Sequence, residues 1–345
     1  EVAELAEQTA GTAIPPEDVE ALYATSEGHP LFLIESVRGG LNETGSLPVD
    51  SAERTDPSPV EGLAEIPPKI YNLLSARLSQ LPPTAQEVAS MAAVIGRAFT
   101  YQVLHEATAL EELLLVDALD ELWARRIVRE QAGDSYDFSH DRIREVAYQE
   151  ISRARRRLLH RRVAETLEEL HGDDLASVAG ELAAHYAQAG DGERAYKYYR
   201  QAADLALAQH AFSYADAMFD AALAHAPNDA AVRIELLLGQ DVLFNYSLQF
   251  ARWRSNIEEQ QTLLASLATS DPRLRLAIEL DRSRYFNNTS AGEESIDAAQ
   301  TAVALALTVD DDRIRAEAYQ ALGESYWFQA RMAEAARAFG QSAYY

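Results

Sequence analysis

Apolar residues recur at three- and four-residue spacing along almost the whole chain, which is the pattern of amphipathic helices. Alternation of apolar and polar residues is scarce, and alanine, leucine, glutamate and arginine, which favour helices, dominate the sequence. The pattern therefore predicts an all-α fold with one small β-hairpin.

Breaks in the helical pattern divide the chain into four parts. Residues 1–38 predict three short helices, and residues 39–66 mix glycine and proline with small polar residues, which is typical of a flexible linker. Residues 67–152 predict four helices and then strands, and residues 153–345 predict helix after helix with short breaks. The four helices of the third part are expected at about 68–80, 84–95, 100–107 and 110–125.

The third part closes with the one clear change from helical to strand-like spacing. Two short extended runs, 127–130 and 136–138, flank the turn dipeptide Gly133-Asp134, which predicts a β-hairpin. Three helices followed by a hairpin is the element order of a winged helix. We therefore predict a winged-helix domain over residues 67–152.

A further helix is expected after the hairpin, capped by Ser139 or Asp141 and running to about Ile151. The helix in the place of a DNA-recognition helix, residues 111–121, carries five acidic residues and no basic one. Acidic side chains repel phosphates, so this helix is unsuited to DNA. The domain is expected to serve as a protein–protein or regulatory module.

The fourth part repeats a register that is typical of tetratricopeptide repeats: small residues where two helices touch, and an aromatic residue that fills the gap to the next hairpin. Stacked hairpins of this kind form an α-solenoid whose concave surface binds peptides, proteins or small ligands. The register is followed most closely by Leu322, Gly323, Tyr326, Ala335, Phe339 and Ser342. A weaker match is Leu238 and Gly239 with Ala251. Candidates to line the concave surface, with core packing as the alternative for each, are Tyr196, Tyr198, Arg252, Trp253, Tyr285 and Trp327.

The composition excludes or disfavours several classes of function. The chain has 55 acidic and 30 basic residues, a net charge of -25, which disfavours nonspecific nucleic-acid binding. It has no cysteine, which excludes disulfides, cysteine-ligated metals and thiol catalysis and fits a reducing, cytoplasmic location. No apolar run is long enough to cross a membrane, so we expect no membrane contact.

One basic stretch, Arg153–Arg162, stands out in this acidic chain. Pairing with the molecule's own surplus acids is one interpretation. Contact with nucleotide phosphates, a partner or nucleic acid is the other.

Catalytic motifs are missing from the chain. A P-loop needs Gly-Lys-Ser/Thr, but the two lysines, Lys69 and Lys197, follow Pro68 and Tyr196. No Gly-x-Ser-x-Gly elbow, no His-Glu-x-x-His helix and no other metal-site spacing of histidines occurs. We therefore expect neither a catalytic site nor a metal site in this chain.

Two short motifs resemble one known class. The segment 25–35, TSEGHPLFLIE, resembles the lid-domain motif of STAND-class signalling ATPases, which include bacterial regulators of the LuxR and maltose-activator type and cyclase-linked ATPases. The segment 138–148, FSHDRIREVAY, resembles the winged-helix motif of the same class. The resemblance implies that Pro30 packs against adenine or holds the lid turn. It also implies that His140 donates a hydrogen bond to the β-phosphate of ADP, while Asp141 caps its helix.

By this resemblance, residues 1–38 are the helical remnant of a nucleotide-binding lid, and a nucleotide-binding domain precedes Glu1. ADP or ATP would then bind only to the full-length protein, and no cofactor is expected in this fragment. The winged helix would stabilise an ADP-bound off state. A ligand or protein partner on the repeats would release it into an ATP-bound form that assembles into an oligomer and controls transcription or signalling.

A free-standing tetratricopeptide scaffold with no nucleotide role stays open as the alternative. A Gly-Lys-Ser/Thr loop upstream of Glu1 would favour the STAND interpretation, and its absence would favour the scaffold. Direct DNA contact through Arg153–Arg162 is a third hypothesis, and we expect no nucleic-acid contact from the rest of this fragment.

Overall fold

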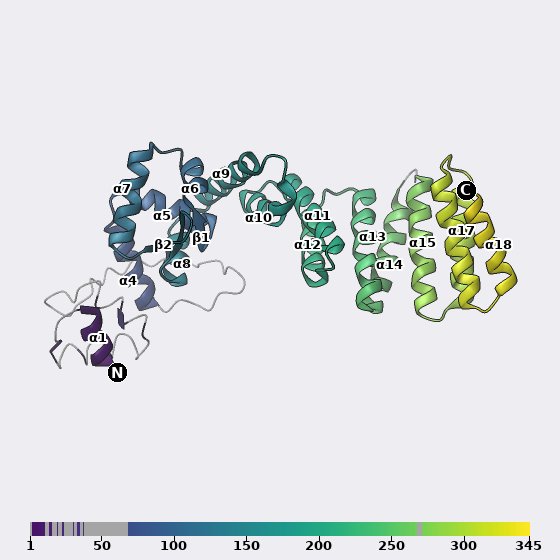
Figure 1. The fold of residues 1–345 in the computed structure, drawn as a ribbon, viewed down its shortest axis with the longest axis horizontal. Helices are drawn as coiled ribbons and strands as arrows, with labels where there is room; N and C mark the ends of the chain where they lie inside the picture. The colour runs from purple at the N-terminus through teal and green to yellow at the C-terminus, as the bar shows by residue number, and fades with distance from the viewer. Residues whose placement is uncertain are drawn as a thin grey trace. The chain divides into compact units, whose positions relative to one another are not determined.

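The computed structural model describes residues 2–10, 68–267 and 271–345, together with the isolated residues 14, 15, 19, 23, 30, 33, 34 and 37. The predicted linker 39–66 and most of the predicted lid lie outside the described residues. Within the lid, helix α1 (Val2–Ala10) is present where a first helix was expected. The chain forms two compact units, Glu1–Thr166 and Leu167–Tyr345, and each is traced in Figure 1.

The first unit is helical with one small sheet. Its helices are α4 (Pro68–Ser79), α5 (Pro83–Ile95), α6 (Tyr101–Thr108), α7 (Glu112–Ala124), α8 (Asp141–Gln149) and the start of α9 (Arg153–His171). Its strands are β1 (Ala98–Thr100), β2 (Val128–Gln131) and β3 (Ser135–Phe138). The four predicted helices are therefore confirmed, each to within a few residues of its expected ends.

The three strands form an antiparallel sheet in the order β1-β3-β2. The predicted hairpin is its β2-β3 half, and Gly133 and Asp134 both adopt positive φ (76° and 54°), as a type I′ turn requires. The first strand was not predicted, because Ala98 and Phe99 fall in the break between the helices expected at 84–95 and 100–107. Phe99 is buried in that strand and stacks on Tyr136 of β3, so pairing with a distant segment decides its conformation.

The second unit is an array of helical hairpins, as predicted. After the 3₁₀ helix Leu175–Val178 come α10 (Ala179–Ala189), α11 (Gly192–Ala208), α12 (Phe212–His225), α13 (Ala230–Ser247), α14 (Phe250–Ser266), α15 (Pro272–Asn288), α16 (Gly292–Ala306), α17 (Asp312–Phe328) and α18 (Met332–Tyr344). Each odd-numbered helix from α11 packs against the even-numbered helix that follows it, and α13, α15 and α17 also pack in succession (Figure 1).

The turns inside these hairpins share one backbone feature. His210, Leu248, Ser290 and Ala330 all adopt left-handed conformations with φ between 57° and 61°. These positions are 38, 42 and 40 residues apart, which is longer than the roughly 34-residue period of tetratricopeptide repeats. The first helices of the hairpins supply the extra length, because α11, α15 and α17 each run for 17 residues.

Close helix contacts occur where the register predicted small residues. A Cβ atom built on Gly239 of α13 would lie 2.8 Å from the ring of Phe219, and one on Gly323 would lie 2.6 Å from Phe339. Phe219 is fully buried, so its ring has no room to move. Glycine at position 239 therefore sets how closely α13 approaches α12.

We expect Gly239→Ala to lower the free energy of unfolding by about 1–3 kcal/mol, the usual cost of overpacking a core. Gly340→Ala is the matched control, because a Cβ at this exposed helical glycine meets nothing within 4 Å. That change is expected to stabilise by about 0.5–1 kcal/mol through helix propensity. Urea denaturation followed by circular dichroism measures both, and equal effects of the two substitutions would contradict this packing.

Candidate functional site

The segment that joins β3 to α8 holds the histidine singled out in the sequence. His140 is the N-cap residue of α8, with extended backbone (φ -148°, ψ 140°) and a half-buried side chain. No side chain caps the helix by a hydrogen bond. The first N–H groups of a helix lack partners within it, so the start of α8 presents backbone donors at the positive end of a helix dipole.

The prediction that Ser139 or Asp141 caps this helix is wrong. The hydroxyl of Ser139 donates instead to the carbonyl of Arg126 at 2.7 Å. Asp141 is already inside the first turn, and its carboxylate pairs with Arg97 at 2.8 Å. Both neighbouring side chains are thus engaged elsewhere, which leaves His140 at the cap position.

Arg97 is fixed near this helix by the sheet. Its carbonyl accepts the N–H of Phe138 at 3.1 Å, one residue beyond the β1-β3 pairing. The ion pair with Asp141 joins the guanidinium of Arg97 to the first turn of α8, next to His140 in the sequence. Imidazole, guanidinium and helix N–H groups can each bind an anion. A phosphate at the start of α8, which the resemblance implies for ADP, stays a prediction.

Pro30, the second predicted site residue, is exposed and lies in helical backbone. The residues that surround it in sequence lie outside the described part of the chain. A role for Pro30 at adenine therefore stays a prediction.

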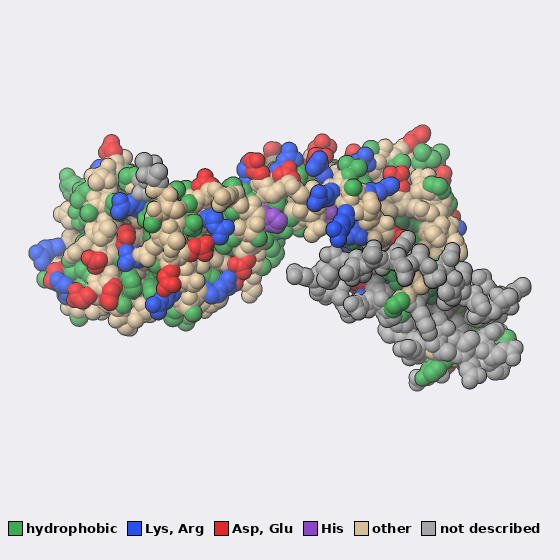
Figure 2. All heavy atoms as spheres, turned by 180° about the vertical axis from the view of Figure 1, so that it is seen from behind, with side chains coloured by type: hydrophobic (Ala, Val, Ile, Leu, Met, Phe, Trp, Pro, Cys, Tyr) green, Lys and Arg blue, Asp and Glu red, His purple; other side chains and the backbone are tan. Residues whose placement is uncertain are grey.

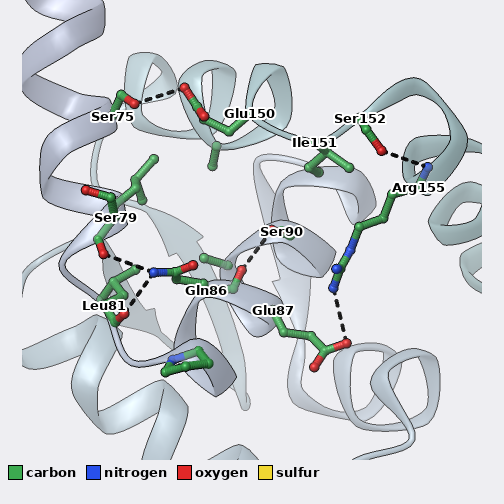
Figure 3. A pocket seen from close by; sticks show the side chains of 14 residues that line it. Ser75, Ser79, Leu81, Gln86, Glu87, Ser90, Glu150, Ile151, Ser152 and Arg155 are labelled. Atoms are coloured by element: carbon green, nitrogen blue, oxygen red, sulfur yellow. Dashed lines mark hydrogen bonds and ion pairs between the residues drawn. The ribbon is translucent and has the colours of Figure 1, made fainter. Parts of the chain in front are cut away.

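A cavity of about 620 Å³ lies at the opposite end of α8, between α4, α5 and the turn into α9 (Figure 3). Glu150 accepts hydrogen bonds there from Tyr71 at 2.5 Å and Ser75 at 2.9 Å. On the far side Arg155 pairs with Glu87 at 3.3 Å. These polar groups already bond to one another and join the helices. Binding a ligand through them would break those bonds.

The aromatic residues proposed to line the repeats divide into buried and exposed. Trp253 is 1% exposed and belongs to the core, whereas Trp327 is 55% exposed. Arg252 is held by Asp216 and Asp220 at 2.5 and 3.3 Å, and the hydroxyl of Tyr198 donates to Glu168 at 2.5 Å. Tyr196, Tyr198, Arg252 and Tyr285 are partly buried, so Trp327 is the most exposed of the six.

A buried polar cluster in the repeats was not predicted. Asp241 of α13 accepts from Asn256 of α14 at 2.9 Å and from Gln260 at 2.5 Å. Asp281 of α15 accepts the indole N–H of Trp253 at 3.0 Å and also bonds to Asp241. Both carboxyls are at most 3% exposed, so these two acidic side chains belong to the core of the repeats.

Burial raises the pKa of both carboxyls in this cluster. Desolvation, with the nearby charge of Asp281, raises the pKa of Asp241 to about 9. Desolvation also raises the pKa of Asp281, although the N–H of Trp253 and the charge of Arg284 oppose the shift. The pair therefore holds at least one proton at neutral pH. The sequence signal that would have found it is an Asp inside each of two long helices, amid apolar neighbours.

No family model matches the sequence. An uncharacterized protein of Rhizobium meliloti (strain 1021) is 30% identical over 182 residues, which is 52% of this chain and 17% of that protein. This chain thus spans less than a fifth of that relative. A STAND protein with a tetratricopeptide repeat sensor from Pyrococcus horikoshii aligns with 98% of this chain and 53% of its own, at 13% identity and a TM-score of 0.34.

None of the helices described is long and apolar enough to cross a membrane. Over the same ranges, no group of three histidine, aspartate or glutamate side chains is arranged to hold a metal ion.

Proposed function

We propose that this chain is the regulatory and sensor portion of a STAND-class ATPase. The observation that carries the proposal is the place of His140, which lies at the uncapped start of α8 directly after the small sheet, in a unit that a helical-repeat array follows. The element order α5-β1-α6-α7-β2-β3 supports the winged-helix assignment of this unit. The matched relative is much longer than the shared region, as this proposal expects.

In this proposal, His140, the first N–H groups of α8 and Arg97 hold the terminal phosphate of ADP. The nucleotide itself would be supplied and hydrolysed by a domain that precedes Glu1. The half-buried imidazole donates to the phosphate, and Asp141 sets the position of Arg97. These contacts favour the closed, inactive arrangement over the open one.

The repeats would act as the sensor. A ligand or protein that binds the array better in the open arrangement shifts the equilibrium toward it, by a coupling free energy of about 1–3 kcal/mol in typical systems. The acidic α7 is unsuited to DNA, so any output on transcription would come from another domain of the full-length protein.

Calorimetry on the full-length protein tests the role of His140. We expect His140→Ala to weaken ADP binding about 10- to 100-fold, since a hydrogen bond to a charged group contributes about 1.5–3 kcal/mol. His105→Ala is the matched control, because His105 is equally half-buried and belongs to the same unit. Unchanged ADP affinity in the His140 variant would refute the proposed role.

The second candidate function is a free-standing interaction scaffold. Trp327, Phe328 and Met332 are each more than half exposed at the turn between α17 and α18, which favours partner binding there. An upstream reading frame without a Gly-Lys-Ser/Thr loop would favour this function over the first.

A further inference from the structure

Charges in the first unit balance but are segregated. Residues 68–166 contain 14 basic and 14 acidic residues, a net of zero in a chain of net -25. The basic residues gather on α9, where Arg153, Arg157, Arg161 and Arg162 are all exposed. Five acidic residues lie within 111–121, the segment that forms α7 and its cap.

The four exposed arginines of α9 have no acidic partner in the described part of the chain. Their neighbour Arg155 pairs with Glu87, and Arg156 donates to the carbonyls of Tyr148 and Gln149. The interpretation that this basic stretch pairs with the molecule's own acids is therefore wrong for the other four.

The repeats behave differently. Most of their arginines pair with acids on a neighbouring helix or one turn along the same helix, and Figure 2 shows basic and acidic side chains interspersed over that unit. Examples of pairs between helices are Arg200–Glu235, Arg233–Glu259 and Arg284–Glu317. The repeat arginines that join no ion pair among the described residues lie on three different helices: Arg275, Arg313 and Arg337. Four such arginines on one helix thus set α9 apart from the repeats.

An exposed apolar residue lies among these arginines. Leu158 is 49% exposed and follows directly on Arg157. A phosphate backbone gains little from leucine, whereas protein interfaces combine arginine with apolar contacts. The net charge of -25 also repels nucleic acid. An acidic protein surface with apolar residues at its centre is the partner that fits.

Helix α7 carries such a surface. Leu113, Val116 and Trp123 are 67%, 38% and 58% exposed. Glu112, Asp117 and Asp120 are exposed beside them, and within the described ranges none of the three joins an ion pair. The spacing of three, seven and ten residues from Leu113 to Val116, Asp120 and Trp123 places these side chains along one side of the helix.

The two surfaces match in length. Glu112 and Asp120 are eight residues apart, as are Arg153 and Arg161, and eight residues of helix span about 12 Å. In an antiparallel arrangement Glu112 meets Arg161, Asp120 meets Arg153, and Val116 lies against Leu158. We propose that α7 of one copy of this chain docks along α9 of a second copy.

Figure 1 places α7 and α9 on opposite sides of the first unit, with α5 between them. Each copy then offers one surface to each of two neighbours, so association is head to tail. The contact needs no nucleotide and is independent of the role of His140.

Sedimentation equilibrium of the 345-residue chain at about 100 mM salt tests the proposal. At this ionic strength the Debye length of about 10 Å screens long-range repulsion but leaves contact pairs. We expect the average mass to rise with protein concentration and to return to the monomer value in about 1 M salt, where the Debye length is about 3 Å. A monomer at every concentration would overturn the proposal.

Charge reversal locates the contact. The variants Arg153→Glu/Arg157→Glu/Arg161→Glu and Glu112→Lys/Asp117→Lys/Asp120→Lys should each be monomeric alone, because each places like charges in contact. Mixed in equal amounts they should associate again, because the native α7 of the first variant complements the native α9 of the second, and the two reversed surfaces also complement each other. Circular dichroism of each variant checks that it is folded.

Two results would refute the assignment. If the α7 variant still associates while the α9 variant does not, the acidic partner surface lies elsewhere on the chain. If both variants are folded and monomeric but their mixture does not associate, α7 and α9 do not contact each other.

Discussion

Trp253→Ala is expected to lower the free energy of unfolding of the repeat unit by about 3–5 kcal/mol, the usual cost of removing a buried aromatic side chain. The indole is 1% exposed and packs among Phe250, Tyr285 and the buried Phe244 and Ile257. Its N–H is also a donor to Asp281, so the substitution leaves a buried carboxyl without that bond. Urea denaturation of the whole chain, followed by circular dichroism, measures the loss.

Two variants separate packing from hydrogen bonding. Trp253→Phe keeps an aromatic ring but removes the N–H, and we expect it to cost about 1–3 kcal/mol for the unsatisfied polar group. Trp327→Ala is the matched control, because this tryptophan is 55% exposed, and its effect should stay within about 0.5 kcal/mol. An equal loss for Trp253→Ala and Trp327→Ala would show that the core around Trp253 is not as described.

The repeat unit is expected to lose stability as pH rises from about 5 to 8, at up to about 1.4 kcal/mol per pH unit for each proton held by the buried pair. Burial raises the pKa of Asp241 to about 9, and raises that of Asp281, above the ordinary aspartate value of 3.8. The folded state therefore binds more protons than the unfolded chain over this range. This contribution is fully present below about pH 4 and is lost as pH approaches the folded-state pKa.

Asp241→Asn should remove most of this pH dependence. Asparagine resembles the protonated acid, can donate to Asp281, and can also donate to the oxygen of Gln260, which is buried and has no partner in the wild type. Asp297→Asn, an exposed acid on α16, is the control and should leave the dependence intact. Urea midpoints measured across the pH range give the slope. An unchanged slope in the Asp241 variant would mean that another group holds the proton.

Local signals in the sequence predicted the helices well. Pro83 at the start of α5 and the Gly133-Asp134 turn act within a few residues, so spacing alone located the helix and the hairpin. The repeat register identified Gly239 and Gly323 as close-contact positions, because a small residue there lets the two helices of a pair approach each other. These features depend on neighbours in the chain.

Features that depend on distant residues were missed. The strand at Phe99 exists because β3 pairs with it. Ser139 does not cap α8 because its hydroxyl donates to the carbonyl of Arg126 instead. Asp241 and Asp281 were not singled out among the 55 acidic residues, because most acidic side chains are exposed. Their burial follows from the stacking of α13, α14 and α15, which spacing along the chain does not encode.

Hydrogen exchange at the start of α8 in the full-length protein tests the central claim most directly. If His140 and the N–H groups after it hold the terminal phosphate of ADP, the amides of Asp141 and Arg142 should exchange about tenfold more slowly, or slower still, with ADP than without nucleotide. In the His140→Ala variant that protection should largely disappear. Equal exchange at these amides with and without ADP, under conditions where ADP is bound, would contradict the account.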